Sequence, residues 1–295
     1  MVARAQVLLA ALCFATTGTA QALGPDGTDP VGVGAARILV GGALLAAVAA
    51  VMHGGRGPRW ARGPVLAAVA GVSAYQLAFF AAVADTGVAV GTIVALGSAP
   101  TLTGLFEWLL ERRRPDPRWA VATALACAGV ALLALAGGEA SVSAPGVAMA
   151  VLAGGSYAAY TLAAKRLLSA GHAPESVMAV AFGLGALALL PALALSTPDW
   201  LLRPDGIGLA LFLGVVPTAV AYVLFARGLR RLSASETSTL TLAEPLTAGM
   251  LGAIVLAEPL TAASAAGAGL VMAGLLALAV RLPLPAVASP ERATA

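Results

Sequence analysis

The chain has 295 residues, of which 60% are hydrophobic and 11% are charged. Soluble globular domains have roughly 45–50% apolar and about 25% charged residues, so the composition excludes an ordinary soluble protein and indicates a helical membrane protein. The formal net charge is +3. Its concentration in alternate loops is typical of membrane topology and does not indicate a nucleic-acid-binding protein.

Apolar runs follow one another along the whole chain, each long enough to cross a bilayer as a helix. We predict an all-α integral membrane protein with ten transmembrane helices, at about 5–23, 31–52, 64–84, 87–109, 118–136, 145–166, 174–195, 206–226, 235–256 and 260–280. Short loops rich in Gly, Pro and charged residues separate these spans. Residues 283–295 are expected to form a disordered cytoplasmic tail.

Basic residues divide unevenly between alternate loops. With the N-terminus in the cytoplasm, cytoplasmic segments hold 15 of the 17 Lys and Arg residues, the outer loops hold only Arg203, and Arg37 lies inside the second span. Since Lys and Arg stay on the cytoplasmic side, both termini are predicted to be cytoplasmic. The preference for Arg over Lys is typical of GC-rich bacterial genomes, which favours the bacterial cytoplasmic (inner) membrane. His53 and His172 fall in cytoplasmic loops and are expected to be solvated.

The second half of the chain restates the first at an offset of about 143–147 residues. The stretch GVAVGTIVALGSAPTLTGL (87–105) aligns with LSASETSTLTLAEPLTAGM (232–250), which pairs Pro100 with Pro245. We therefore predict two five-helix repeats, 1–138 and 139–282. Because five is odd, the second repeat would insert upside down relative to the first, as in secondary transporters whose solute sites lie near the bilayer midplane.

These features resemble the EamA-type branch of the drug/metabolite transporter superfamily. The resemblance is carried by the prolines of the fourth and ninth spans, by Arg37 in AARILVGG, and by the helix ends LLERRRP and VLAEPLTAA, where Leu-Glu and Ala-Glu replace the usual Gly-Glu. It implies ten helices in two inverted repeats. It also implies a plasma-membrane efflux protein for small metabolites, often amino acids or related compounds.

Glu244 lies near the middle of the ninth span, directly before Pro245. An acidic residue at that depth costs about 2.5–3.5 kcal/mol on insertion scales and is a functional candidate by default. Pro245 is expected to leave the carbonyl of Thr241 without its helical partner. Thr237, Thr241 and Glu244 share one helical face, which should point into the transport cavity. Glu244 would contact a substrate amine or carry a proton; alternatively, it is a protonated acid bonded to the backbone groups that Pro245 releases.

Other polar residues in the spans are further candidates for solute binding or coupling. Arg37 would extend to the outer interface, pair structurally, or face the cavity to meet Glu244 or a substrate carboxylate. Ser98, beside Pro100, would supply a hydroxyl or only pack. The same two alternatives hold for Tyr75, Gln76, Tyr157, Tyr160 and Tyr222. Helix breaks are expected at Pro100, Pro217 and Pro245.

The predicted spans lack the usual signatures of an enzyme. They contain no His, no acidic companion close to Glu244 in sequence, and no Gly-rich phosphate loop. We therefore predict a protein that is not an enzyme, with no catalytic residues, no metal and no cofactor. The favoured function is secondary export of small metabolites, such as amino acids or related amphiphilic solutes, by alternating access; the movement would be either coupled to protons through Glu244 or facilitated. The alternatives are a membrane receptor or scaffold without transport and an intramembrane enzyme.

The expected partners are the lipid bilayer and a small-molecule solute. Ala265, Gly269 and Ala273 form a small-xxx-small stripe in the tenth span, which predicts close helix packing, either inside the chain or in a homodimer. Glu107, near the cytoplasmic end of the fourth span, is expected to pair with Arg112–Arg114.

Overall fold

The computed structural model describes residues 1–54, 57–112, 115–135, 143–196, 198–257 and 261–279. Within these ranges every regular element is a helix and there is no strand, which confirms the all-α fold class. Eight helical segments are long and apolar enough to cross a membrane, and two further apolar helices are shorter. The chain is therefore a multi-pass membrane protein.

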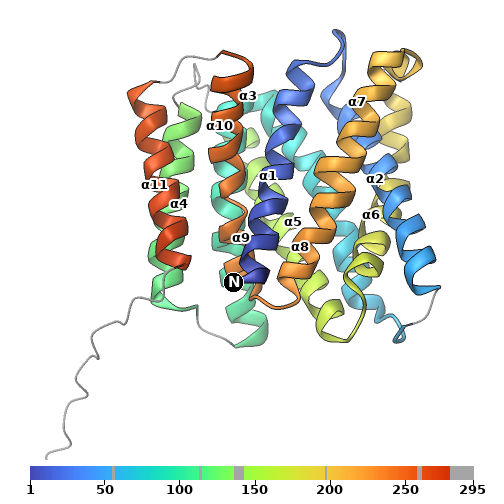
Figure 1. Cartoon of the computed structure of the whole chain (residues 1–295), viewed down its shortest axis with the longest axis horizontal. Helices are drawn as coiled ribbons and strands as arrows, with labels where there is room; N and C mark the ends of the chain where they lie inside the picture. The colour runs from blue at the N-terminus through green and yellow to red at the C-terminus, as the bar shows by residue number, and fades with distance from the viewer. Residues whose placement is uncertain (55–56, 113–114, 136–142, 197, 258–260, 280–295) are drawn as a thin grey trace, which may run out of the picture.

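The first half of the chain forms four helical elements and the second half forms the rest (Figure 1). In order they are α1 Val2–Ala22, α2 Pro30–His53, α3 Arg62–Glu111, α4 Pro117–Leu135, α5 Ala144–Ser169, α6 Pro174–Leu195, the short η1 Pro198–Leu202, α7 Pro204–Gly214, η2 Val215–Val220, α8 Ala221–Leu229, α9 Ala234–Leu240, α10 Ala243–Val255 and α11 Ala262–Ala279.

The helices form one bundle in which α11 and α4 lie together at one side and α2 and α6 at the other (Figure 1). The largest cluster of buried side chains lies where α2, α5, α6 and α8 meet, and it includes Ile38, Leu167, Phe182 and Phe225. In a membrane this core forms without a strong hydrophobic force between helices, so close packing by small residues matters. Thus α3 and α5 approach closely at Gly71 and Gly154.

Polar side chains cap the N-termini of several helices. Asp29 precedes Pro30, and its carboxylate accepts a hydrogen bond from the backbone N–H of Gly32 at 2.6 Å. Ser143 and Ser233 begin α5 and α9 in the same way. These caps satisfy N–H groups that would otherwise lack helical acceptors.

Three departures from regular helix occur within the spans. At Gly87 the backbone has φ 77° and ψ 164°, a conformation that only Gly adopts easily. Gly87 thereby joins the two predicted spans that α3 contains. Around Pro217 the chain forms a π-helical turn, η2, in which the Thr218 hydroxyl donates to the Leu213 carbonyl at 2.8 Å. The third departure separates α9 from α10 at Thr241–Leu242.

The predicted break at Pro100 is wrong. Pro100 is buried inside α3, which runs on as a helix from Val90 to Glu111. A proline removes one backbone donor without obliging the chain to break when the neighbouring groups are held in place. The two prolines that align in the sequence therefore have different local structures.

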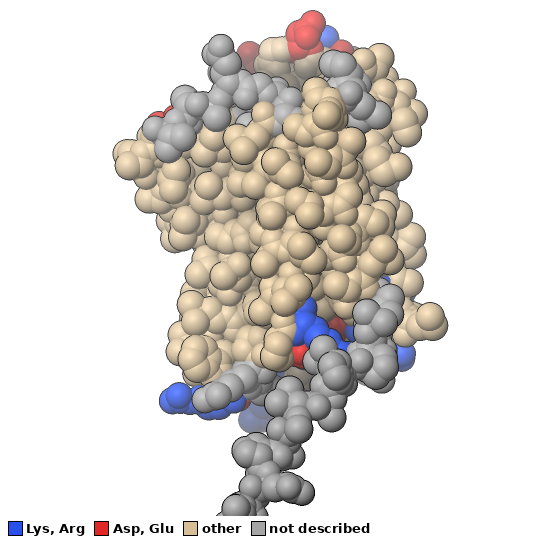
Figure 2. All heavy atoms as spheres, turned by 90° about the vertical axis from the view of Figure 1, so that its left-hand side faces the viewer, with Lys and Arg blue, Asp and Glu red and all other residues tan. Residues whose placement is uncertain are grey.

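Charged residues gather at the two ends of the bundle. Figure 2 shows most of the Lys and Arg, together with some Asp and Glu, at the end where α1 begins, which we call the basic end; further Asp and Glu lie at the opposite, acidic end, and an uncharged band separates the two. At the basic end, Arg4 pairs with Glu236 at 2.7 Å and Arg227 pairs with Glu175 at 2.6 Å. An uncharged band between two polar ends is the surface expected of a membrane-spanning bundle.

Of the two histidines expected to be solvated, His172 is buried and His53 is partly exposed. His172 is 3% exposed and stacks on Trp60, with ring centroids 3.8 Å apart, and burial lowers the pKa of the His172 imidazole. His53 Nε2 lies 3.4 Å from a carboxylate oxygen of Glu175. The prediction failed because loop composition does not show which loops pack on each other.

The small-residue stripe predicted in the last span does not pack inside the bundle. Ala265, Gly269 and Ala273 are exposed, and no atom would contact a methyl group added at Gly269. The face of α11 that packs on α4 instead carries Gly267 and Gly274. A homodimer through the exposed stripe stays a prediction.

Candidate functional site

A cavity of about 60 Å³ lies beside the break between α9 and α10. Glu244 is the eleventh residue of the 22-residue segment Ala234–Val255, so the cavity lies near the middle of that span. Five helices besides α9 and α10 reach it. Its lining consists of Phe14, Thr17, Arg37, Tyr75, Leu96, Ala99, Tyr157, Tyr222, Ser238, Thr241, Leu242 and Glu244.

The backbone at the break is satisfied by its own neighbours. The N–H of Glu244 donates to the Thr241 carbonyl at 2.9 Å, so that carbonyl is not left unpaired as predicted. The Thr241 hydroxyl donates to the Ser238 carbonyl at 2.7 Å. Pro245 falls in the first turn of α10, where its missing N–H removes no helical bond.

The carboxylate of Glu244 is available to a ligand. It accepts no hydrogen bond from the backbone around Pro245 and forms no ion pair within 4.0 Å in the described ranges. The arrangement therefore does not match the structural interpretation, in which a protonated Glu244 satisfies groups released by the proline. The carboxylate faces the cavity together with Tyr75, Tyr157 and Tyr222.

Arg37 brings a positive charge to the same cavity. Its Nη2 donates to the Gln76 side-chain oxygen at 3.5 Å, and Gln76 in turn donates to the Gly34 carbonyl at 3.3 Å. The Nε of Arg37 is buried and has no hydrogen-bond partner among the described residues. Arg37 therefore lines the cavity, where its guanidinium lies close enough to Glu244 for their charges to interact.

All four tyrosines of the chain converge around these two charges. Ring centroids lie 6.3 Å apart for Tyr75 and Tyr157, and 6.2 Å apart for Tyr160 and Tyr222. The Tyr157 hydroxyl lies 3.3 Å from the Thr241 hydroxyl. The faces of aromatic rings attract cations, so rings beside a carboxylate favour a positively charged ligand group.

Tyr160 and Gln76 lie one layer behind the cavity. They line an adjoining space of about 10 Å³, which shares Tyr75, Tyr157 and Tyr222 with the main cavity. The Tyr160 hydroxyl donates to the sulfur of Met178 at 3.2 Å. These two residues are therefore positioned to support the lining, and Gln76 does so by holding Arg37.

Two further predicted residues, Thr237 and Ser98, line neither the cavity nor the adjoining space. Thr237 is fully buried, and its hydroxyl donates to the Ser233 carbonyl at 2.8 Å. Ser98 donates to the Ala95 carbonyl at 3.2 Å and lies against Gly154 of α5. Their hydroxyls are used within the protein, as expected where an unpaired polar group would be costly.

The sequence analysis missed several lining residues. Phe14 and Thr17 lie three positions apart on α1, and Ser238 lies three positions before Thr241. Residues three apart share a helical face, so the hydroxyl spacing was a usable signal for Ser238. Phe14 has no such signal, since an aromatic residue in a span is usually packing.

A hydroxyl network holds α9 in place behind the cavity. The indole N–H of Trp119 donates to the Thr239 hydroxyl at 2.9 Å, and the Thr123 hydroxyl lies 2.8 Å from the same oxygen. From α3, the Thr103 hydroxyl donates to that of Ser238 at 3.4 Å. Side-chain hydrogen bonds of this kind join neighbouring helices in membranes.

Glu107 anchors the start of α9, which corrects the predicted ion pair. Its two carboxylate oxygens accept hydrogen bonds from the backbone N–H groups of Ala234 and Ser235, at 3.2 and 3.1 Å. Arg112 forms no ion pair in the part of the chain that is described, and 113–114 lie outside it. A negative charge at a helix N-terminus interacts favourably with the helix dipole.

Replacing Glu107 with Gln should lower the thermal stability of the protein. One amide oxygen cannot accept both N–H groups with the strength of a carboxylate, so we expect a loss of about 1–3 kcal/mol. Thermal unfolding in detergent measures this loss. The control is Glu111→Gln, one turn further along α3 and half-exposed. Equal melting temperatures for both variants would contradict the anchoring role.

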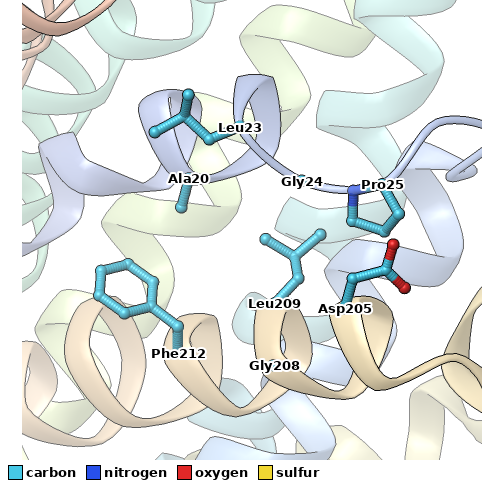
Figure 3. A pocket seen from close by; sticks show the side chains of 8 residues that line it. All are labelled: Ala20, Leu23, Gly24, Pro25, Asp205, Gly208, Leu209 and Phe212. Atoms are coloured by element: carbon cyan, nitrogen blue, oxygen red, sulfur yellow. The ribbon is translucent and has the colours of Figure 1, made fainter.

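A separate pocket of about 300 Å³ lies at the acidic end, between the end of α1 and the start of α7 (Figure 3). Leu23, Leu209 and Phe212 surround it, with the Asp205 carboxylate at one side. Asp205 is already paired with Arg203 at 2.7 Å. This pocket contains none of the residues singled out in the sequence, but α1 contributes to the lining of both spaces.

Comparison with known proteins places these observations in a family. The sequence model of the EamA-like transporter family matches residues 3–135 and again residues 144–280. A Bacillus subtilis (strain 168) protein named uncharacterized transporter YwfM is 41% identical over 272 residues, covering 92% of each chain. A Streptantibioticus cattleyicolor protein named probable terminal-alkyne amino-acid exporter is 28% identical over 245 residues, covering 81% of each.

The fold is also similar to that of a solved protein. A crystal structure matches with a TM-score of 0.81 at 21% sequence identity, covering 94% of this chain and 98% of the other. At that identity the likeness concerns the arrangement of helices alone.

Proposed function

The chain belongs to the EamA-like transporter family, and from this premise we propose that it is a secondary transporter that exports small metabolites by alternating access. The solute site is the cavity between Arg37 and Glu244. The solutes are amino acids or related amphiphilic compounds, and movement is coupled to protons through Glu244. No nucleic acid takes part.

The proposed architecture is ten transmembrane helices in two inverted five-helix repeats, 1–138 and 139–282. The double match of the family model supports this, since each matched part holds five apolar helical segments. In the first part these include both halves of α3, and in the second α7 to α8 and α9 to α10 each form one segment. Inverted repeats bring corresponding helices together at the membrane midplane, where solute sites form.

The proposed location is the bacterial inner membrane, with both termini in the cytoplasm. The gathering of Lys and Arg at the end where α1 begins supports this orientation (Figure 2). The export direction then runs from the basic end, past the cavity, toward the acidic end.

The observation that carries the proposal is that Arg37 and Glu244 line one small cavity at mid-span. Both charges face the same space, and the rings of Tyr75, Tyr157 and Tyr222 contribute to its lining. A small zwitterion could place its carboxylate at Arg37 and its amine at Glu244. Polyanions such as phosphorylated sugars are disfavoured, because Arg37 is the only basic residue among the described residues of the lining. The name of the Streptantibioticus relative agrees with this solute class.

Alternating access requires the basic end to open and close. In the described conformation Arg4 of α1 binds Glu236 of α9, while Glu175 of α6 binds Arg227 of α8. We propose that these two salt bridges keep the cytoplasmic side closed and that they break when the cavity opens to the cytoplasm. The pocket between α1 and α7 would then lie on the outer side of the pathway (Figure 3).

Uptake into proteoliposomes tests the proposed function. Amino acids and amphiphilic cations are screened with and without a pH gradient, against liposomes that lack the protein. We expect uptake of at least one amino acid, accelerated by the gradient. Uptake that does not respond to the gradient would remove proton coupling. Absence of uptake for every solute would contradict the transport proposal.

The role of Arg37 can be separated from that of the rest of the cavity. Arg37→Gln should weaken the binding of a transported amino acid by about 10- to 100-fold, since it removes charge-assisted hydrogen bonds worth about 1.5–3 kcal/mol. The matching amino-acid amide, which lacks the carboxylate, should bind both forms equally. The apparent affinities of the amino acid and of its amide are measured by their competition with uptake of a transported solute. Equal losses for acid and amide would contradict the assignment.

A further inference from the structure

An apolar groove of about 570 Å³ lies between α2 and α6, away from the central cavity. It is open to the surroundings of the bundle, and its lining includes Ala43 and Ala46 of α2 and Val180 and Leu187 of α6. A furrow of this kind on a membrane-spanning face is in contact with lipid. The question is whether its shape and its ends select one kind of lipid.

The groove exists because the two helices touch through glycine and leave small side chains at the edge. A methyl group added at Gly42 would lie 2.8 Å from the Phe182 carbonyl oxygen, so the helices pack almost backbone to backbone there. The exposed alanines of α2 then project too little to fill the space beside this contact. Small residues allow close helix approach in membranes and create such furrows.

The length of the groove matches one leaflet of the bilayer. Along α2 the lining runs from Leu39 to Ala50, which at ~1.5 Å per residue is about 16 Å. The hydrocarbon core is about 30 Å thick, so one leaflet is about 15 Å deep. An acyl chain of a single lipid would therefore lie along the whole groove.

One end of the groove has the features of a headgroup site. Trp60 lines that end, at the junction of α2 with α3, and stacks on His172. Tryptophan is enriched at membrane interfaces. Arg59 and Arg62 flank Trp60; both are exposed, and neither forms an ion pair in the described part of the chain.

The nearby acidic residue does not cancel these charges. Glu175 lies at the same corner of the bundle, but its carboxylate is 6% exposed and is bound by Arg227 and His53. Two guanidinium groups therefore remain available beside Trp60. They would meet an anion located at the polar end of an acyl chain.

We propose that this groove binds one anionic phospholipid from the leaflet at the basic end of the bundle. An acyl chain lies between α2 and α6, Trp60 lies at the level of the glycerol backbone, and Arg59 and Arg62 bind the phosphate group. Clusters of basic residues at the cytoplasmic surface attract anionic lipids in this way. The site is independent of the transported solute, because it shares no residue with the central cavity.

Native mass spectrometry of the full chain tests the site with two lipids of equal chain length, dioleoylphosphatidylglycerol and dioleoylphosphatidylcholine. We expect tighter binding of the anionic lipid, by about fivefold for each available guanidinium. The double variant Arg59→Gln/Arg62→Gln should lose this preference. The control Arg112→Gln/Arg118→Gln removes two charges near α4, at the other side of the bundle, and should keep it (Figure 1).

The groove itself is tested by Ala46→Trp, which fills it, against Val151→Trp on the exposed face of α5. Only the first should lower the binding of both lipids. Equal binding of the two lipids by the wild type would overturn the proposal, as would an anionic preference that persists in Arg59→Gln/Arg62→Gln. If Ala46→Trp fails to fold, the charge variants decide the outcome, since both arginines are exposed.

Discussion

Glu244→Gln is expected to lower gradient-driven transport by about 100-fold while leaving the melting temperature unchanged. In the described conformation the carboxylate faces the cavity and makes no hydrogen bond or ion pair within the described ranges, so the isosteric amide breaks no direct polar contact of the fold. It does remove the charge that would bind an amine and the group that would carry a proton. A charge-assisted bond of up to about 3 kcal/mol accounts for a loss of that size.

The measurement combines uptake into proteoliposomes with thermal unfolding of the same preparations. Glu111→Gln makes the same chemical change at the end of α3, outside the cavity, and should transport normally. Wild-type transport by Glu244→Gln would remove the carboxylate from the mechanism. A large fall in its melting temperature would instead favour a structural role.

Gly129→Ala should strongly destabilise the contact between α4 and α11. The added carbon would lie 2.6 Å from the Gly267 carbonyl oxygen and 2.6 Å from the Val271 backbone nitrogen. Backbone atoms cannot move aside as a flexible side chain can, so the helices must separate. Overpacking of this kind costs about 1–3 kcal/mol, and sometimes more.

Thermal unfolding in detergent measures this effect, and Gly269→Ala is the matched control. Gly269 is exposed on α11 with no atom within 4 Å of an added methyl group. There the gain in helix propensity, up to about 1 kcal/mol, should keep or raise the melting temperature. Equal effects at both positions would contradict the close packing of α4 on α11.

Hydrophobicity predicted the helices well because a membrane span must be both long and apolar. The expected spans correspond to helical segments throughout the described chain, including the two halves of α3. Local deviations were harder to predict. Pro100 and Pro245 align in the sequence, yet only the second lies beside a break, because the surrounding packing decides whether a helix continues past a proline.

The candidate site was predictable where a polar residue would be costly in lipid. Arg37, Glu244 and the tyrosines were identified by that rule, and they line the same cavity or the space behind it. The prediction that Thr237 faces the cavity was wrong, because a shared helical face gives the direction of a side chain but not the extent of a cavity along the helix. Glu107 was misinterpreted because its partners lie 127 and 128 residues away in sequence.

The π-helical turn at Val215–Val220 sets the direction in which the side chains after it in the span point. It holds one more residue than an α-helical turn would, and each residue corresponds to about 100° of rotation. Leu209 and Phe212, before the turn, face the outer pocket, while Tyr222, just after it, faces the central cavity. A chain one residue shorter at this point could form a continuous α-helix only by turning Tyr222 away from the central cavity. The extra residue therefore allows one span to contribute side chains both to the outer pocket and to the central cavity.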